Sequence, residues 1–390
     1  MPRSTCTPRT PLFPTARAPS ARPRALLLAV IAAVAACTSP AVPVASPTPA
    51  PTHEAGALNV TALLDLSGSR WPSGAPQRDA LQLWSDQHAA ATPRVRLKVV
   101  DVAGSASRTL IELRRAAVED RADAVIVGVP VDYDATFARA VQLTQLPVLF
   151  TLPIADPVTA GGGWAFALAP TPDQIARTTL DDAAARAVLA SGIVVTDESA
   201  SAIPERVALV ADLARRGVTA TVVKASDPNK LRTMLAAAPV ALFAGAPRAY
   251  VDAARAATTG TLLYLSYLCD SADIGDLRDA ASHATWPGIK WIAANSSGAS
   301  GERAAFLQAF LDRAGPPTSV AASAFDALSL LATAADRTGD PVRLRDKLQT
   351  GSFVGVATTY SFTPLRRAGF AASDLAFLRY TGARATPVLR

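Results

Sequence analysis

Cysteine and histidine are the residues of this 390-residue chain whose types could support metal, redox or nucleophilic chemistry. They are scattered, with no CxxC or HxxxH pair, as Cys6, Cys37, His53, His88, Cys269 and His283. This spacing argues against zinc fingers, iron–sulfur clusters and His-rich catalytic zinc sites. The sequence also has no GxSxG, GxGxxG or GxxxxGK[ST] motif, which disfavours serine hydrolases, dinucleotide enzymes and P-loop ATPases. We therefore expect a protein that is not an enzyme and uses no metal or cofactor.

Cys37 is the one cysteine whose neighbours suggest a role. Residues 25–36 read ALLLAVIAAVAA and follow an arginine-rich stretch. Twelve apolar residues are too few to span a bilayer, which takes ~20, but they suit an export signal. The ending Val34-Ala35-Ala36-Cys37 resembles a bacterial lipobox, which implies a signal peptide over 1–36 and a lipidated Cys37. The alternative is an ordinary signal peptide with a chance cysteine.

The segment after Cys37 is rich in proline, alanine, serine and threonine, and it cannot build a core. It predicts an extended tether over residues 37–56. Lipid anchor and tether together place the folded part outside the cytoplasm, attached to the cell membrane. With Cys37 acylated, Cys269 has no partner for an intramolecular disulfide, and a buried, unreactive thiol is its simplest interpretation.

The net charge of +6 comes mostly from the N-terminal segment. Residues 1–36 hold five arginines and no acidic residue, which leaves 33 basic and 32 acidic residues, a net of +1, for the rest. No basic stripe marks a phosphate-binding face, so we expect no nucleic-acid partner.

From Leu58 onward, apolar runs and helical periodicities alternate along the chain. The predicted strands are 58–64, 95–100, 124–129, 147–151, 165–168, 193–196, 219–223, 240–244, 262–265, 289–292, 359–363 and 375–380. The predicted helices are 76–88, 108–119, 132–144, 174–188, 205–215, 228–237, 248–257, 301–313, 320–335 and 341–348. A capping box, Thr171-Pro172-Asp173-Gln174, precedes the fourth helix. Strands separated by single helices mean right-handed βαβ units and parallel sheets.

Three stretches, read in order, resemble the type I periplasmic binding proteins, in the branch that binds branched-chain amino acids for ABC transporters. Residues 58–84 match the family's opening strand, Ser-Gly loop and helix. Residues 121–150 match its third strand, helix and fourth strand. Residues 322–369 carry Phe325-Asp326-Ala327 and the segments that follow it in the family's order.

The resemblance implies an α/β fold of two Rossmann-like lobes with parallel-sheet cores, joined by three crossovers and closing on a ligand. The crossovers are expected near 169–173, 288–295 and 355–365. The implied lobes are 57–170 plus 293–360 for lobe 1, and 171–292 plus 361–390 for lobe 2. Ligands of open α/β sheets bind beyond the carboxyl ends of the strands, so the loops after the strands should face the cleft.

Two ligand loops depart from the family. Amino-acid binders hold the ligand with a Ser-Ser pair after the third strand and a Ser-x-Thr run after the fourth. Here the loops read 129–133, VPVDY, and 151–155, TLPIA. Without those hydroxyls, burying a zwitterion would cost several kcal/mol. We therefore expect a neutral or partly apolar ligand rather than a standard amino acid.

Nine residues are the candidate ligand contacts that the resemblance and the loops suggest: Ser67, Gly68, Trp71, Asp132, Tyr133, Thr151, Pro153, Tyr267 and Asp270. Several have a structural alternative. Ser67-Gly68 could be a turn, Trp71 a packed loop anchor, Asp132 a helix cap, and Tyr133 a core residue beside Phe137.

The resemblance implies a lipid-anchored, extracytoplasmic solute-binding protein that delivers a small molecule to ABC permease subunits. The alternative from a different class is a sensory or partner-binding lipoprotein that kept the clamp fold without transport. Permease and ATPase genes beside this one would favour the first hypothesis, and a histidine kinase or cell-wall gene the second.

Overall fold

The computed structural model describes residues 56–68, 71–186, 189, 191–200, 202–245, 260–269, 284–297, 299–336, 340–380 and 387–390. The predicted signal peptide, Cys37, nearly all of the tether, the helix expected at 248–257, Asp270 and His283 lie outside these ranges. Within them, every helix is too short or too polar to cross a bilayer.

The first sheet has five parallel strands in the order β2-β1-β3-β4-β5. They are β1 (Ala57–Leu64), β2 (Arg94–Asp101), β3 (Ala124–Gly128), β4 (Val148–Phe150) and β5 (Ala165–Ala167). The connecting helices are α1 (Trp71–Gln87), α2 (Ala106–Val118) and α3 (Ala135–Thr144). From β1 the chain adds β2 on one side and then β3, β4 and β5 on the other, so the strand order switches between β1 and β3. Open α/β sheets hold ligands near such a switch point.

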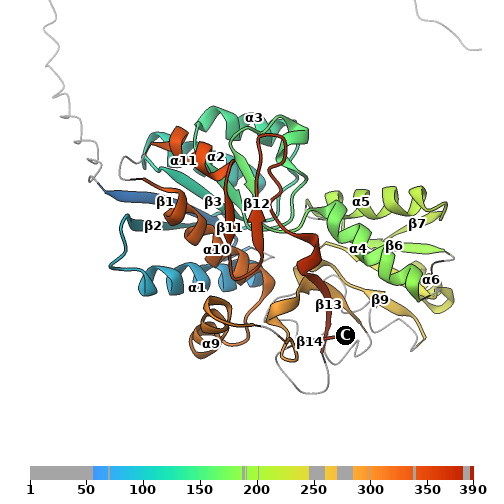
Figure 1. Ribbon diagram of the computed structural model, residues 1–390. Coiled ribbons are helices and arrows are strands. Elements are labelled where there is room, and N and C mark those ends of the chain that lie inside the picture. The colour runs from blue at the N-terminus through green and yellow to red at the C-terminus, as the bar shows by residue number, and fades with distance from the viewer. Residues whose placement is uncertain are drawn as a thin grey trace, which may run out of the picture. The chain divides into compact units, whose positions relative to one another are not determined.

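Alternate residues of β1 point to opposite faces of this sheet, and each face has its own apolar cluster. Val60 and Leu64 pack with Trp84 of α1 and Phe325 of the late helix α10 (Ser319–Ala334). Leu63 packs on the other side with residues of α2 and α3. Figure 1 shows α1 on one side of the sheet and α2 and α3 on the other.

The second sheet has four parallel strands in the order β7-β6-β8-β9. They are β6 (Gly192–Thr196), β7 (Ala220–Lys224), β8 (Val240–Ala244) and β9 (Leu262–Tyr264). Helices α4 (Pro172–Ala185) and α5 (Ala202–Arg215) cover one face, and α6 (Pro228–Ala237) covers the other. The predicted capping box is confirmed at the start of α4, where the side chains of Thr171 and Gln174 bond each other's backbone N–H.

The strand predicted at 289–292 is wrong. Strand β10 is Trp286–Ile289, and 290–292 form a 3-10 turn. β10 pairs antiparallel with β13 (Leu375–Arg379), which pairs with β14 (Val388–Leu389). Gly288 permits this pairing, because a Cβ there would lie 2.4 Å from the Leu378 side chain. A long-range contact thus decides the strand's position.

The remaining helices are α9 (Glu302–Ala314) and α11 (Pro341–Leu348), and a hairpin joins β11 (Ser352–Val354) to β12 (Thr359–Ser361). The sequence predicted only the second strand of this hairpin. Asp340 caps α11, with its side chain accepting from the Val342 N–H. The described chain thus forms two parallel-sheet lobes, as the resemblance implied, and their residue boundaries stay a prediction.

Asp326 attaches the loop after β11 to α10. Its buried carboxyl accepts hydrogen bonds from the N–H groups of Val356 at 2.7 Å and Ala357 at 2.8 Å, and from the Tyr360 hydroxyl at 3.0 Å. Burial raises the pKa of Asp326 to about 7, although these hydrogen bonds lower it. This segment lies in the range expected to contain the third crossover.

Candidate functional site

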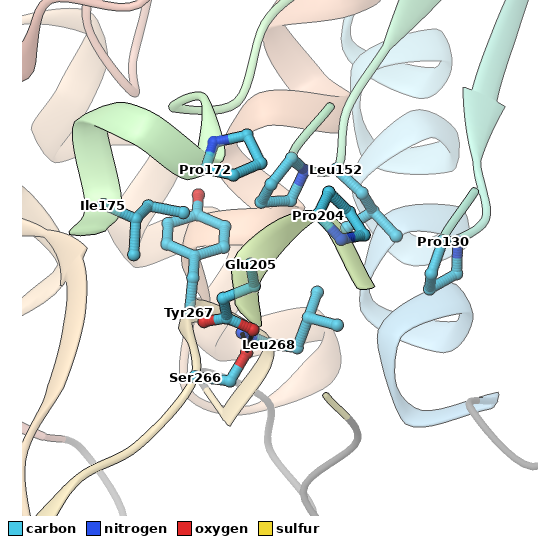
Figure 2. Close-up of a pocket in the computed structure, with 10 residues that line it drawn as sticks. Pro130, Leu152, Pro172, Ile175, Pro204, Glu205, Ser266, Tyr267 and Leu268 are labelled. Atoms are coloured by element: carbon cyan, nitrogen blue, oxygen red, sulfur yellow. Dashed lines mark hydrogen bonds between the residues drawn. The ribbon is translucent and has the colours of Figure 1, made fainter. Parts of the chain in front are cut away.

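A pocket that is partly open to solvent lies at the carboxyl ends of strands from both sheets. Among the described residues, its wall is formed by the loops after β3, β4 and β9 and by the first turns of α4 and α5. Its described lining residues are Pro130, Leu152, Pro153, Pro172, Ile175, Pro204, Glu205, Ser266, Tyr267 and Leu268. Figure 2 shows Pro172, Pro204 and Leu152 near Tyr267 and Glu205, with Pro130 farther to the right. This is the position that the fold class predicts for a ligand.

Most of this wall is apolar. Four prolines, two leucines and one isoleucine contribute carbon surface, and the proline rings carry no N–H donor. The first turn of α4 is fixed in place because its capping-box residue Gln174 also donates from Nε2 to the Phe370 carbonyl at 3.1 Å. The wall is therefore shaped by residues with little freedom to move.

Glu205 is the acidic residue among the described residues of the pocket wall. It lies in the first turn of α5 and is only 7% exposed. Its Oε2 accepts hydrogen bonds from the Ser266 hydroxyl at 2.8 Å and from the Gly245 N–H at 3.1 Å, and the Tyr267 N–H also donates to the carboxylate. The side chain therefore ties α5 to the loops after β8 and β9.

The pKa of the Glu205 carboxyl is raised toward neutral pH. Burial raises its pKa to about 7, while the three hydrogen bonds lower it. The negative charge of Asp197, in the loop after β6, adds to the increase. Perturbed carboxyls in pockets are frequent at functional sites. Glu205 is thus a polar group whose charge changes within the physiological pH range.

Of the nine predicted ligand contacts, Pro153 and Tyr267 line the pocket. Thr151 lies directly before the lining residue Leu152, but its side chain is buried elsewhere. The Thr151 hydroxyl donates to Gln77 Oε1, and Gln77 Nε2 donates to the Gly128 carbonyl at 2.9 Å. This network joins α1, β3 and β4, so the Thr151 hydroxyl holds the protein together rather than facing the pocket.

Ser67 and Gly68 form a turn outside the pocket lining. The Ser67 hydroxyl donates to Asp101 Oδ2 at 2.5 Å, and the Gly68 N–H donates to Asp65 Oδ1 at 2.9 Å. Burial alone would raise the pKa of Asp101, but hydrogen bonds from the Ser67 hydroxyl and three backbone N–H groups lower it to about 2. The turn interpretation of these two residues fits the structure.

Asp132 and Tyr133 do not reach the pocket either. Helix α3 begins three residues later than predicted, and its cap is Asp134, whose Oδ1 accepts the Phe137 N–H at 2.8 Å. Asp132 is therefore not the helix cap, and its side chain is exposed. Tyr133 packs edge-on against Phe150 in the core of the first sheet. The core interpretation of Tyr133 fits the structure.

Trp71 opens α1, but its side chain is outside the described set, as is the whole of Asp270. Glu205 and Ser266 were not among the predicted ligand contacts. The helix was predicted to begin at residue 205, whereas α5 begins at Ala202, so Glu205 lies in its first turn. An acidic residue following Pro204 at a helix start, after a strand's carboxyl end, was the available signal.

Among the described residues, no group of three or more His, Cys, Asp or Glu side chains could hold a metal ion. The described pocket wall also contains no lysine, arginine or histidine. The arrangement can therefore enclose a small, mainly apolar molecule and offer it acceptors at one end.

The sequence profile of a family described as periplasmic binding protein matches residues 57–385. No curated protein sequence matches the chain. A solved extracellular ligand-binding receptor from Rhodopseudomonas palustris HaA2 is similar at 16% identity and a TM-score of 0.73, over 86% of this chain and 99% of that one.

Two further solved structures were captured with ligands. The branched-chain amino acid transporter substrate-binding protein LivJ of Streptococcus pneumoniae, in complex with isoleucine, has 16% identity and a TM-score of 0.70, over 85% of this chain and 97% of its own. An R. palustris ABC transporter solute-binding protein, in complex with benzoate, has 17% identity and a TM-score of 0.69, over 86% and 98%. At these identities the likeness shows the fold alone.

Proposed function

This chain belongs to the periplasmic binding protein family, a family of extracytoplasmic solute-binding proteins rather than enzymes, and we propose that it delivers a small ligand to an ABC importer. The observation that carries the proposal is the pocket at the carboxyl ends of strands from both sheets. A ligand held there touches both lobes, so its binding energy can favour a closed form over an open one.

The ligand we propose is a small molecule other than a standard amino acid. In the first lobe, the described part of the pocket wall consists of Pro130, Leu152 and Pro153, in the loops where the family's amino-acid binders place hydroxyls. The neighbouring hydroxyl of Thr151 already donates to Gln77. A buried α-carboxylate would therefore lack donors from these side chains, and leaving it unpaired costs several kcal/mol.

We propose further that Cys37 carries lipid and anchors the protein at the outer face of the cell membrane. The support is the sequence Val34-Ala35-Ala36-Cys37 at the end of an apolar segment. In the Cys37→Ala variant, the protein should be released from the membrane fraction or remain unprocessed, as judged by fractionation and mass spectrometry. Unchanged, lipid-bearing protein in the membrane fraction would contradict this.

A thermal-shift screen of sugars, amino acids, amides, amines and aromatic acids tests the ligand-binding function. A ligand at 100 times its dissociation constant adds about 2.7 kcal/mol to the free energy of unfolding, which raises the melting temperature measurably. Small-angle scattering of the protein with a hit should show compaction. If no compound shifts the melting temperature, solute binding is not supported and a sensory or partner-binding role becomes the better account.

A further inference from the structure

We propose that Glu205 is the specificity-determining residue of this pocket and selects a ligand with an apolar body and a hydrogen-bond donor, an amine or hydroxyl, but no carboxylate. This inference rests on the proposed function, because it takes the pocket as the ligand site. It adds a residue that the loops of the first sheet gave no reason to suspect.

The geometry leaves acceptor capacity on Glu205. An ionised carboxylate offers about four acceptor positions, and Gly245, Ser266 and Tyr267 occupy three of them. Ser266 donates its hydroxyl proton to Glu205, and its oxygen accepts the Leu268 N–H at 3.2 Å. This end of the pocket therefore favours a ligand group that donates.

The negative charge of the pocket wall also favours a ligand group that donates hydrogen bonds. The described lining contains one ionisable carboxyl and no cationic side chain. Asp197, in the loop after β6, adds negative potential, because its charge raises the pKa of Glu205. A ligand carboxylate would meet this potential with no cationic partner among the described lining residues, whereas an ammonium would be stabilised by it.

The rest of the pocket sets the ligand's body. The proline, leucine and isoleucine side chains surround a space that is partly open to solvent, and they present carbon surface to it. This surface favours a ligand with an apolar body, whose carbon atoms replace water against these side chains.

Four one-ring probes that differ in their polar group provide the test: benzylamine, benzyl alcohol, benzoate and phenylalanine. In calorimetric titrations, benzylamine and benzyl alcohol should bind at least about tenfold more tightly than benzoate and phenylalanine. Glu205→Gln should weaken benzylamine by about tenfold or more, because it removes the charge and keeps the amide oxygen as acceptor. The matched control is Glu198→Gln, an exposed carboxylate on the preceding loop that pairs with Lys224 and should change affinity by less than about twofold.

A measurement on the wild-type protein keeps the test independent of how the variant folds. Alkylammonium groups stay protonated across neutral pH, so benzylamine affinity should rise by several-fold from about pH 6 to pH 8 as Glu205 ionises. Benzyl alcohol should respond less. Among the described residues, the charged or titratable groups near Glu205 are Asp197 and Tyr267 on the neighbouring loops and Arg206 on its own helix. The pKa of Glu205 itself is about 7.

The inference is overturned if benzoate or phenylalanine binds as tightly as benzylamine, if Glu205→Gln leaves benzylamine affinity unchanged, or if none of the four probes binds. The wider screen separates this from failure of the proposed function. If an amino acid or an aromatic acid binds and Glu205→Gln does not affect it, the protein is a solute-binding protein and only the selectivity is wrong. If nothing in the screen binds, the proposed function fails as well.

Discussion

The two sheets contribute differently to the pocket at their carboxyl ends. In the first sheet, polar side chains at the strand ends are bonded within the protein: the Ser67 hydroxyl donates to Asp101 and the Thr151 hydroxyl donates to Gln77. What remains to face the pocket is apolar, such as Pro153. The first sheet therefore provides shape and rigidity.

In the second sheet, polar groups take part in the wall itself. Glu205, Ser266 and Tyr267 all line the pocket, and the carboxylate of Glu205 joins the helix start to two loops. Substitutions at the strand ends of the first sheet (the first region) should thus change stability more than ligand choice. Substitutions at the strand ends of the second sheet and the start of α5 (the second region) should change ligand choice.

Among the substitutions, Gln77→Ala in the first region should have the largest effect on stability. The Gln77 side chain is fully buried. Its Nε2 donates to the Ser73 and Gly128 carbonyls, and its Oε1 accepts a hydrogen bond from the Thr151 hydroxyl. Gln77→Ala leaves these groups unpaired and should lower the free energy of unfolding by about 3 kcal/mol in urea denaturation.

The control for this experiment is Asp132→Asn, on an exposed side chain at the end of the same region, which should change stability by less than about 0.5 kcal/mol. If Gln77→Ala costs no more than the control, the network does not hold the first region together.

The pH dependence of stability should reflect two buried carboxyls, Glu205 in the pocket wall and Asp326 on α10. The pKa values of Glu205 and Asp326 are raised to about 7 in the folded protein, whereas carboxyls of the unfolded chain titrate near 4. The folded protein therefore binds more protons between about pH 4 and pH 7, and stability from these groups falls as the pH rises through that window. The loss should be about 3 to 4 kcal/mol per group, because one pKa unit corresponds to about 1.4 kcal/mol.

Glu205→Gln and Asp326→Asn should each flatten this pH profile, measured as the urea midpoint at several pH values. The two variants should differ in ligand binding, because Glu205 lines the pocket and Asp326 bonds the loop at 356–357. A profile that both variants leave as steep as in the wild type would show that other groups cause it.

A smaller effect is expected from Thr151→Val. The change removes one buried hydroxyl that donates to Gln77 and should cost about 1 kcal/mol of stability. Ligand affinity should stay within about twofold of wild type, because the hydroxyl is already bonded away from the pocket. A large loss of affinity with unchanged stability would mean that Thr151 contacts the ligand, as the sequence first suggested.

Much of the fold could be predicted because its signals are local. The apolar run of β1 and the capping box before α4 depend on neighbouring residues and are found where the sequence placed them. The start of α3 was misplaced because Asp132 and Asp134 are both plausible caps, and the packing of Tyr133 between them selects the second. β10 was misplaced because its partner, β13, lies about ninety residues away.

The site was less predictable for the same reason. Whether the Ser67 and Thr151 hydroxyls face a ligand depends on Asp101 and Gln77, which are distant in sequence and have no recognisable motif. Glu205 reads as an ordinary acidic residue in a first helical turn until the loops after β8 and β9 close around it.

Amide hydrogen exchange, followed by mass spectrometry with and without a saturating hit from the ligand screen, tests the central claim most directly. Ligand binding in the proposed pocket should slow exchange in residues 151–154 and 265–268 and at the first turns of α4 and α5. The peptide covering 66–68 should change little. Protection confined to 66–68 and 132–133, with none at the first turn of α5, would contradict a ligand site built on Glu205.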